Sequence, residues 1–384
     1  MRFRAQIQNI HTFTKFTASL ATLGQIAWVR LDSKDVRFTV IPEQGTQVWA
    51  VISIDTIFDD SYTIQSAAPN NTINLEVPLA PLQRALKSAQ NAISASIRLT
   101  KKDNIPLLSL TITTQTLNSS NPANASINGR SDQFGGNGAA SSTDGLNGTD
   151  DFREESVDMS GGRQDRETVV TQDVPIRVLA PASVEGLHEP RCREPDVHIV
   201  LPNLIQLKSI SDRFTRLALT TKTNTRTGFS SSNMGPKLEL SGNMHGCLRL
   251  ALRTDAMNIH SLWTGLENPE LDPEQIAEGH DGLETHPSTR MKQLGDPSGQ
   301  GDEGWATVRI DGKDWGKVLS VGRLGGRVIA CFCDESALIL YVFLNSDEPG
   351  VGESVLTVSA TALNSTITVV NADLMQYYIS SYSA

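Results

Sequence analysis

Residues 79–102 read LAPLQRALKSAQNAISASIRLTKK, and this stretch decides the fold. One apolar stripe recurs at helical spacing in its first part, formed by Leu79, Leu82, Leu86, Ala89 and Ile93. The opposite side of the same helix is polar and carries Arg84, Lys87, Ser88 and Asn91. After residue 95 the pattern changes to the short alternation that is typical of a β-strand. The stretch therefore predicts an amphipathic helix at 79–93 and a strand at 96–100.

The same two patterns recur along the rest of the chain. Further helices are predicted at 11–23, 202–217 and 311–323. Strands are predicted in the first half at 2–8, 27–31, 36–40, 47–54, 72–77, 107–113 and 174–179, and in the second half at 197–201, 237–241, 247–252, 306–310, 327–333 and 337–344. Each half thus places two helices among several strands. Because regular βαβ alternation is absent, the fold class is α+β, with two similar domains each built of two helices packed on antiparallel sheet.

The composition describes a soluble globular protein. The chain has 384 residues, of which 39% are hydrophobic and 20% charged, and this length suits two or three domains. Its longest apolar run, 337–344, is far shorter than the ~20 residues that cross a bilayer, so no membrane partner is expected. The basic start MRFRAQI lacks the apolar stretch of a signal peptide, and four cysteines do not make a disulfide framework. We therefore expect an intracellular, reduced protein.

Negative charge is concentrated in two segments of biased composition. Residues 118–149 are almost entirely Asn, Ser, Gly, Ala and Thr, and residues 265–304 are rich in Gly, Pro, Glu and Asp. The stretch 117–166 carries a net charge of −4 and 265–304 one of −8, against −10 for the whole chain. The other 294 residues therefore carry +2, and a DNA partner is not excluded. Because such stretches bury little apolar surface, we expect 117–166 and 265–304 to be disordered insertions.

The remaining sequence divides into two domains of similar pattern. They comprise 1–116 with 167–180, and 196–264 with 305–384. The stretch 181–195 between them is punctuated by prolines and is predicted to be the interdomain linker. After residue 345, a Thr/Val/Ala-rich run and the segment MQYYI at 375–379 are both candidates for the last strand of the second sheet. The pattern alone leaves that choice open.

Positive charge is enriched on the predicted helices. The four helices hold nine bases and three acids, whereas the whole chain has 33 bases and 43 acids. The bases are Lys15, Arg84, Lys87, Lys208, Arg213, Arg216, Lys313, Lys317 and Arg323. A cationic helix face suits contact with phosphate groups, and that contact does not depend on base sequence. A solvated surface is the better explanation for any single helix, but four helices with the same bias weaken it.

Several blocks of the sequence resemble one known family. They are MRFRA at 1–5, LQRALKSAQNA at 82–92, IRLTKK at 97–102, IPLLSLTI at 105–112, TQDVPIRV at 171–178 and EPDVHIVLP at 194–202. Together they resemble the hydroxyurea-sensitivity checkpoint subunit of the heterotrimeric DNA-damage sliding clamp, the nine-one-one clamp. The resemblance is specific through residue 217 outside 117–166, and it is weaker but collinear beyond. It implies the fold of the replicative processivity clamp, in which helices line a ring and sheets form its outside.

The resemblance also implies a function and its partners. The chain is expected to join two sister subunits in a ring, to be placed on DNA by an ATP-dependent clamp loader, and to recruit checkpoint and repair proteins in the nucleus. Double-stranded DNA is then held topologically without sequence specificity, and edge strands of neighbouring subunits pair to close the ring. Partner proteins are expected at the linker and the nearby outer sheet. The family's helix positions imply that eight bases face DNA: Lys15, Arg84, Lys87, Lys208, Arg213, Arg216, Lys313 and Lys317.

No motif predicts catalysis, a cofactor or a metal site. Cys331 and Cys333 lie two apart in an apolar run without a second cysteine pair, so we expect core residues. The segment GKDWGKV at 312–318 departs from a phosphate-binding loop in spacing and in its last residue, so we expect a helix start. The adjacent acids Asp59 and Asp60 are expected to be solvated. Two alternatives stay open, namely a metal-dependent DNA-repair enzyme and a checkpoint adaptor that does not encircle DNA.

Overall fold

The computed structural model of the chain describes residues 1–42, 45–116, 166–224, 236–255, 257–269, 284–344 and 374–380, together with the pairs 360–361 and 364–365. The insertion predicted at 117–166 lies outside these residues, except for Arg166, which begins a strand. Within the described part of the chain, no helix is both long enough and apolar enough to cross a membrane.

The first half of the chain forms one α+β unit. Its elements in chain order are β1 (Arg2–Gln6), α1 (Ile10–Ala21), β2 (Ile26–Leu31), β3 (Asp35–Val40), β4 (Gln47–Ser53), α2 (Ile54–Ile57), β5 (Thr63–Gln65), the 3₁₀ helix η1 (Pro69–Asn71), β6 (Ile73–Pro78), α3 (Leu79–Ser88), β7 (Ser94–Lys102), β8 (Ile105–Thr116) and β9 (Arg166–Pro175). A short strand β10 (Arg177–Val178) and a helical turn α4 (Pro181–Val184) then lead into the linker. The strand predicted at 174–179 is thus divided between β9 and β10.

The second half repeats this order. Its elements are β11 (Val197–Val200), α5 (Leu204–Asn224), β12 (Lys237–Asn243), β13 (Leu248–Thr254), β14 (Met257–Trp263), α7 (Pro287–Leu294), β15 (Trp305–Asp311), α8 (Gly312–Val318), the 3₁₀ helix η3 (Leu319–Leu324), β16 (Val328–Cys333), β17 (Ala337–Phe343), the short pair β18 (Ala360–Thr361) and β19 (Asn364–Ser365), and β20 (Leu374–Ser380). Apart from short elements, each half runs strand, helix, three strands, strand, helix, three strands. The predicted α+β duplication is confirmed.

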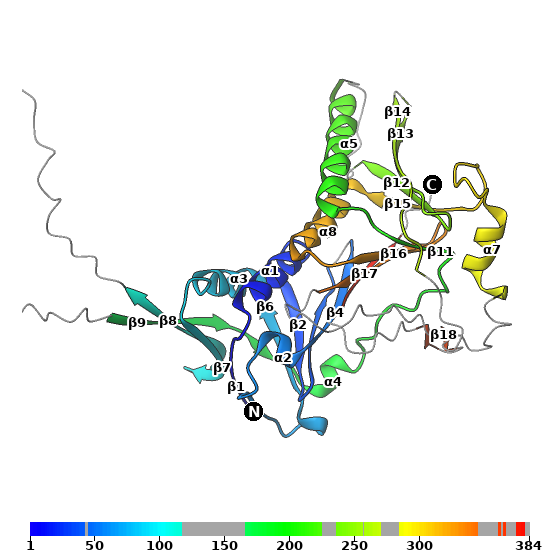
Figure 1. Cartoon of the computed structure of the whole chain (residues 1–384). Helices are drawn as coiled ribbons and strands as arrows, with labels where there is room; N and C mark the ends of the chain where they lie inside the picture. The colour runs from blue at the N-terminus through cyan, green and yellow to red at the C-terminus, as the bar shows by residue number, and fades with distance from the viewer. Residues whose placement is uncertain are drawn as a thin grey trace, which may run out of the picture.

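Three larger antiparallel sheets carry these elements. Their strand orders are β5-β1-β7-β8-β9, β10-β6-β2-β3-β4-β20-β17-β16-β11 and β14-β13-β12-β15. The nine-stranded central sheet draws its strands from both halves, and it runs through the middle of the molecule in Figure 1. Main-chain hydrogen bonds therefore join the two domains in addition to the linker.

The domain junction is the antiparallel pairing of β4 with β20. Its register sets Val48 opposite Tyr377 and Trp49 opposite Gln376. Strand β17 pairs with the other side of β20, so the last strand of the chain is central to the sheet. The segment 375–379 therefore completes the second sheet, which decides between the two candidates that the sequence left open.

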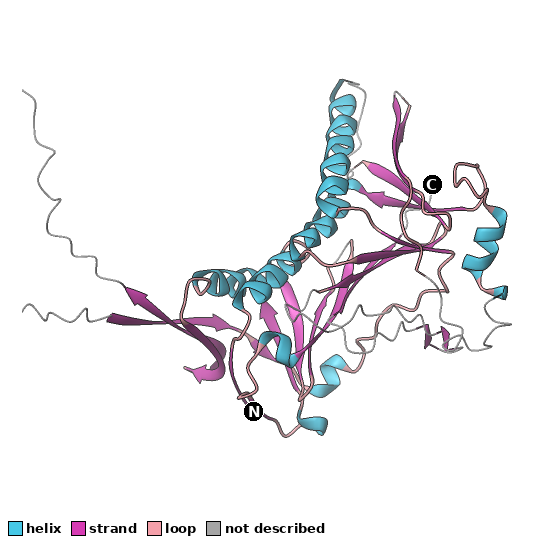
Figure 2. Ribbon diagram, in the orientation of Figure 1, coloured by secondary structure: helices cyan, strands magenta, loops and turns pink. Residues whose placement is uncertain are grey.

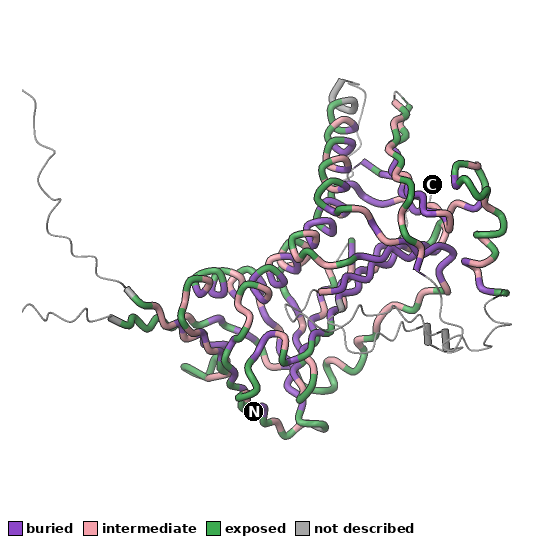
Figure 3. The backbone as a smooth tube through the Cα atoms, viewed as in Figure 1, coloured by how far each residue is buried: buried purple, intermediate pink, exposed green. Residues whose placement is uncertain are grey.

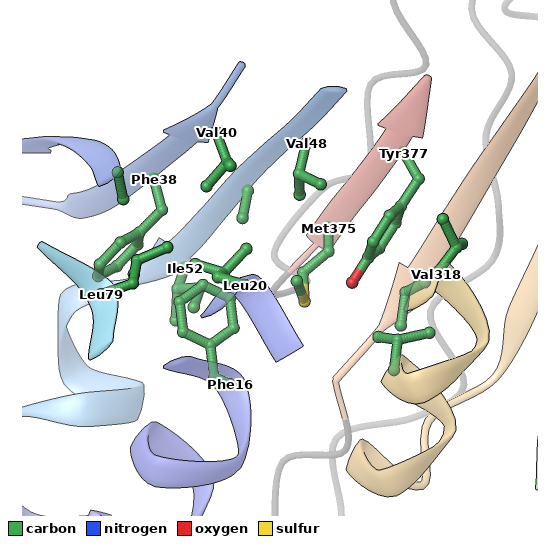
Figure 4. Close-up of a cluster of buried hydrophobic side chains, with 14 of the residues drawn as sticks. Phe16, Leu20, Phe38, Val40, Val48, Ile52, Leu79, Val318, Met375 and Tyr377 are labelled. Atoms are coloured by element: carbon green, nitrogen blue, oxygen red, sulfur yellow. The ribbon is translucent and has the colours of Figure 1, made fainter. Parts of the chain in front are cut away.

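A single hydrophobic core continues across this junction. Alternate residues of the central strands point into it, as Val36, Phe38 and Val40 of β3 do. The ring of Phe16 on α1 lies 4.9 Å from that of Phe38, in an edge-to-face contact. Figure 4 shows one cluster in which residues of α1, β3, β4, β20 and α8 meet, among them Phe16, Leu20, Val48, Met375, Tyr377 and Val318. The two domains therefore share one core at their junction.

The main helices lie together on one side of the sheets (Figures 1 and 2). Helix α1 contacts α3 and η3, and α5 contacts η3 and α8, so the row crosses the domain junction. Figure 3 shows that these helices are buried toward the sheets and exposed on the opposite side. The helix start predicted near 312 is confirmed, because the Asp311 carboxylate accepts hydrogen bonds from the backbone N–H groups of Lys313 and Asp314. Gly325, with φ of +76°, ends η3 in the left-handed conformation.

Some boundaries differ from the sequence predictions for local reasons. Helix α3 ends at Ser88 and not at 93, because the Ile93 N–H donates to the Thr113 carbonyl at 2.8 Å where the chain enters the β7–β8 pair. Helix α5 continues beyond 217 to Asn224. Strand β14 was not predicted, because Ser261 occupies a core-side position and Leu262 an exposed one, which interrupts the apolar alternation.

The prediction of disorder at 265–304 is wrong for the described residues 265–269 and 284–304. Helix α7 lies in this segment and contacts β11. Its cap residue His286 is buried and accepts a hydrogen bond from the Ser288 N–H at 3.2 Å. The Asn268 side chain donates to the His198 carbonyl at 2.7 Å and thereby fixes the start of the segment to β11. Amino-acid composition does not reveal these few buried polar side chains, which form hydrogen bonds with main-chain groups of the segment and of β11.

The domain junction yields a stability prediction at Tyr377. Its ring is fully buried, and its hydroxyl has no hydrogen-bond partner among the described residues. Removing that unsatisfied hydroxyl in Tyr377→Phe is expected to raise the free energy of unfolding by about 1 kcal/mol. Removing the ring in Tyr377→Ala is expected to lower it by about 3–5 kcal/mol. Urea unfolding of both variants checks this, and a clear loss of stability in Tyr377→Phe would contradict it.

Candidate nucleic-acid interface

The eight bases predicted to face DNA all lie on the row of main helices. Lys15 is on α1, Arg84 and Lys87 are on α3, Lys208, Arg213 and Arg216 are on α5, and Lys313 and Lys317 are on α8. Seven of them are exposed, and Lys208 is half-buried. The helices cover one side of the sheets (Figure 2), so the structure brings charges from both halves of the chain to one face of the molecule.

This helical face is continuous where the two domains meet. The hydroxyl of Thr22, the cap of α1, lies 3.2 Å from that of Ser320 in η3. Ser320 also donates to the Lys317 carbonyl at 2.5 Å, and the Thr22 hydroxyl lies 3.5 Å from the same oxygen. Short hydroxyl side chains thus let the end of one domain's helix contact the helix of the other. The face therefore spans the full row from α3 to α5.

The N-terminal part of the face carries its bases without counter-ions. Lys15 projects from α1 on the side opposite the buried residues Phe13 and Phe16. Arg84 and Lys87 alternate in the same way with the buried residues of α3. No acid among the described residues lies within ion-pair distance of Lys15, Arg84 or Lys87. Their charges are therefore available to an anionic ligand.

Two of the predicted bases in the C-terminal part have acidic partners. The Lys208 Nζ donates to the Gly316 carbonyl at 2.6 Å and lies 3.3 Å from the Asp212 carboxylate, so it ties α5 to α8. Lys317 is paired with Asp314 at 2.9 Å. Arg213 and Lys313 are exposed, and the Arg216 guanidinium donates to the Asp212 carbonyl at 3.3 Å. The i,i+4 spacing of Lys208 and Asp212 is the signal that sequence reasoning passed over.

The opposite, outer face of the central sheet is apolar and is covered in part by the linker. A small cluster formed by Ile329, Cys331, Ile339, Tyr341 and Phe343 packs there against Cys192 of the linker. The Tyr378 hydroxyl donates to the Glu189 carboxylate and holds the linker over this surface. Burial raises the pKa of Glu189, and the Tyr378 hydrogen bond offsets part of that increase. The linker is therefore fixed by contacts that sequence reasoning did not predict.

The side chains that a catalytic or metal site could use have structural surroundings. Cys331 and Cys333 are buried in β16 as predicted, and burial raises the pKa of Cys333 to about 12. Burial lowers the pKa of His198 to about 4, and its Nε2 lies 2.8 Å from the Pro269 carbonyl. Asp59 and Asp60 are exposed, as predicted. Among the residues that the structure describes, no group of three or more His, Cys, Asp or Glu side chains is placed to hold a metal ion.

Two outer strands end the sheets at opposite ends of the molecule. Strand β9 is the last strand of the five-stranded sheet, and β14 is the first of the four-stranded sheet. On β9, Val169 and Val170 are 61% and 41% exposed, and on β14 Leu262 is 44% exposed. Such edges present unpaired main-chain groups together with exposed apolar side chains, which favours pairing with another chain.

The molecule contains an internal example of this kind of pairing. In the repeated order of elements, β20 occupies the position of β9 and β4 occupies the position of β14. Strands β20 and β4 pair with each other at the domain junction, whereas their counterparts β9 and β14 each end a sheet. A last strand of one unit is therefore complementary to the fourth strand of another unit in this architecture.

Comparison with known proteins points to one family. The family model described as "Hus1-like protein" matches residues 1–383. The chain is 33% identical to "Checkpoint protein hus1" of Schizosaccharomyces pombe over 349 residues, which cover 91% of this chain and 94% of that protein. It is 24% identical to "Checkpoint protein HUS1" of Homo sapiens, with 72% of this chain and 79% of that protein covered.

Solved structures agree on the fold. The crystal structure of proliferating cellular nuclear antigen from Entamoeba histolytica superimposes with a TM-score of 0.53 at 10% identity, covering 99% of each chain. PCNA from Thermococcus kodakaraensis gives a TM-score of 0.51 at 12% identity, covering 99% of this chain and 100% of that one. At such low identity these similarities establish the architecture alone.

The two kinds of base on the helical face predict different effects on stability. Lys208→Ala removes the hydrogen bond from α5 to Gly316 of α8 and the ion pair with Asp212 within α5, so the free energy of unfolding is expected to fall by about 1 kcal/mol. Arg213→Ala on the exposed side of the same helix is the matched control, with an expected change within about 0.5 kcal/mol. Denaturant unfolding measures both. Equal effects at the two positions would show that the bond to Gly316 contributes nothing.

Proposed function

The chain belongs to the Hus1-like family and is a non-catalytic subunit of a checkpoint sliding clamp, and from this premise we propose that it encircles duplex DNA with its helices facing the duplex. The observation that carries this proposal is the row of helices α3, α1, α8 and α5, whose exposed bases come from both domains. Because this family is non-catalytic, membership in it excludes the alternative of a metal-dependent repair enzyme.

The charges on the helical face support non-specific contact with the phosphate backbone. Arg84, Lys87, Arg213 and Lys313 are exposed and are not restricted to one short region. Phosphate contacts position a protein on DNA without reading its sequence, and their strength falls as salt rises. A ring that holds DNA topologically needs only such dispersed contacts, because tight binding at one point would hinder sliding. Lys208 and Lys317 contribute less to this lining, since each has an acidic neighbour.

The outer strands β9 and β14 support assembly with two sister subunits into a heterotrimer. In this proposal β9 pairs with the strand of one sister that corresponds to β14, and β14 pairs with the strand of the other sister that corresponds to β9. The β20–β4 pair is the internal example, so the new pairs are expected to be antiparallel. Pairing satisfies the edge main-chain groups and covers the exposed side chains of Val169 and Leu262.

A closed ring has consequences for its other partners. Circular DNA cannot enter an intact ring, so an ATP-dependent clamp loader is proposed to open it and place it on double-stranded DNA. Checkpoint and repair proteins are proposed to dock at the linker and the apolar outer face beneath it, where Cys192 packs against the small cluster of β16 and β17. We place this activity in the nucleus. An adaptor that never encircles DNA is the competing account, and release on linearising a circular template separates the two.

Charge reversal on the helical face tests the DNA-facing assignment. Arg84→Glu with Arg213→Glu is expected to reduce retention of the assembled clamp on nicked circular DNA, and to lower the salt dependence of retention by about one for each base removed. Both side chains are exposed, so the fold is expected to persist. Lys34→Glu with Arg191→Glu changes charge equally at exposed positions away from the helices and is the control. Unchanged retention in the first variant would argue against the lining.

Substitution on β9 tests ring closure. Val169→Glu with Val170→Glu places charges on the outer strand and is expected to weaken assembly with the sister subunits by at least about tenfold. The free chain should keep its stability, because both side chains are exposed. Ile93→Glu with Ile105→Glu, at positions 58% and 53% exposed, is the matched control. Sedimentation of the mixed subunits reports the outcome, and wild-type assembly of the β9 variant would exclude this strand from the interface.

A further inference from the structure

Three arginines gather on the face of the first sheet that points away from the helices. Arg2 and Arg4 lie two residues apart on β1, and the register sets Arg4 directly opposite Arg98 of β7. All three side chains are exposed. Their sequence neighbours Phe3 and Ile97 are buried in the core under the helices, so the alternation of the strands fixes the arginines on the outer side. Figure 1 shows β1 beside β7 near the N-terminus.

The spacing of these arginines suits one small anion. Side chains directly opposite in an antiparallel pair have Cβ atoms about 4.5–5.5 Å apart, and a diagonal neighbour lies about 7–8 Å away. Arg4 and Arg98 hold the first relation, and Arg2 and Arg98 hold the second. The guanidinium groups on these long side chains can therefore converge on a single phosphate group, for which their paired N–H donors are well matched.

The positive charge of this cluster has no counter-ion on the face of the sheet that carries it. The strands of the sheet contain two acids, Glu167 and Asp173, both on β9. Asp173 is separated from Arg98 by Ser109 of β8, which is about 10 Å at the usual strand spacing. Among the described residues no acid forms an ion pair with Arg2, Arg4 or Arg98. Like charges directly opposite each other destabilise a sheet, so the cluster carries a cost that an anion would remove.

Another arginine pair shows how the chain treats the same arrangement elsewhere. Arg30 of β2 lies opposite Arg37 of β3 on the outer face of the central sheet. There Arg37 has the Asp35 carboxylate at 3.7 Å, and its charge also acts on Glu189 of the linker. The first sheet offers no such compensation to Arg4 and Arg98. In the second half, β11 and β16 correspond to β1 and β7 and set His198 opposite Cys331, so the shared architecture does not require arginines there.

We propose that Arg2, Arg4 and Arg98 form a phosphate-binding site whose ligand is a phosphorylated serine or threonine in a partner protein. The choice of a peptide rests on the proposed function, because in a ring with the helices inward these arginines face outward and cannot reach the encircled duplex. A compact cluster of guanidinium groups is also the arrangement by which proteins recognise single phosphorylated side chains. Thr100, which lies beside Arg98 on the same face, adds a hydroxyl donor to the site.

Fluorescence anisotropy of the full-length chain tests the site without requiring the ring. The probes are fluorescein-labelled Ala-Gly-phosphoserine-Gly-Ala, its unphosphorylated twin and a ten-nucleotide oligothymidylate, at low salt. The phosphopeptide is expected to bind at least about tenfold more tightly than its twin, and Arg4→Gln with Arg98→Gln is expected to weaken it by at least about tenfold. The control Arg30→Gln with Arg37→Gln removes equal charge and should stay within about twofold of the wild type.

Two further measurements keep the result decisive. Arg98→Lys retains the charge but not the paired donors, and it is expected to give an intermediate loss of phosphopeptide binding while the midpoint temperature of unfolding is kept. Retention of the assembled clamp on circular DNA should not change in Arg4→Gln with Arg98→Gln, so failure here is distinguishable from failure of the DNA-lining proposal. Equal binding of both peptides, equal loss in the control variant, or tighter arginine-dependent binding of oligothymidylate would each overturn the proposal.

Discussion

The pairing of β4 with β20 is the constraint on which the rest of the structure depends. It joins strands from residues 47–53 and 374–380 into one sheet, so the chain's last strand closes a core that its first residues begin. Because the same pairing fixes how the two domains sit, it also aligns their helices in one row and leaves β9 and β14 at opposite ends. An arrangement with a cationic helical face and two complementary edges follows from this single junction.

Charge is distributed so that different faces can meet different partners. Exposed bases of α1, α3, α5 and α8 lie on the helical side, where dispersed contacts with phosphates suit a sliding ring. The outer side combines an apolar surface under the linker with the arginines of β1 and β7. Lys208 illustrates that position alone does not make a base available, because its charge is engaged by Asp212 and Gly316.

Much of this fold could be predicted from local sequence, and the remainder depends on long-range contacts. The apolar stripe of α3 and the alternation of the central strands give their elements directly, because burial of one side sets the period. The pairing of β20 with β4 joins residues more than 300 positions apart, and no local pattern specifies it. Helix α7 was missed because His286, Ser288 and Asn268 gain their bonds only in the folded chain. Counting charges along the sequence identified the bases of the helices, but it did not identify the groups with which Lys208 and Lys317 pair.

Amide hydrogen exchange of the free chain and of the chain assembled with its sister subunits tests the central claim most directly. If the outer strands close a ring as β20 and β4 join the domains, the edge amides of β9 and β14 gain protection on assembly, while those of the β4–β20 pair are protected in both states. Protection that appears elsewhere, with β9 and β14 exchanging as rapidly after assembly as before, would contradict the account.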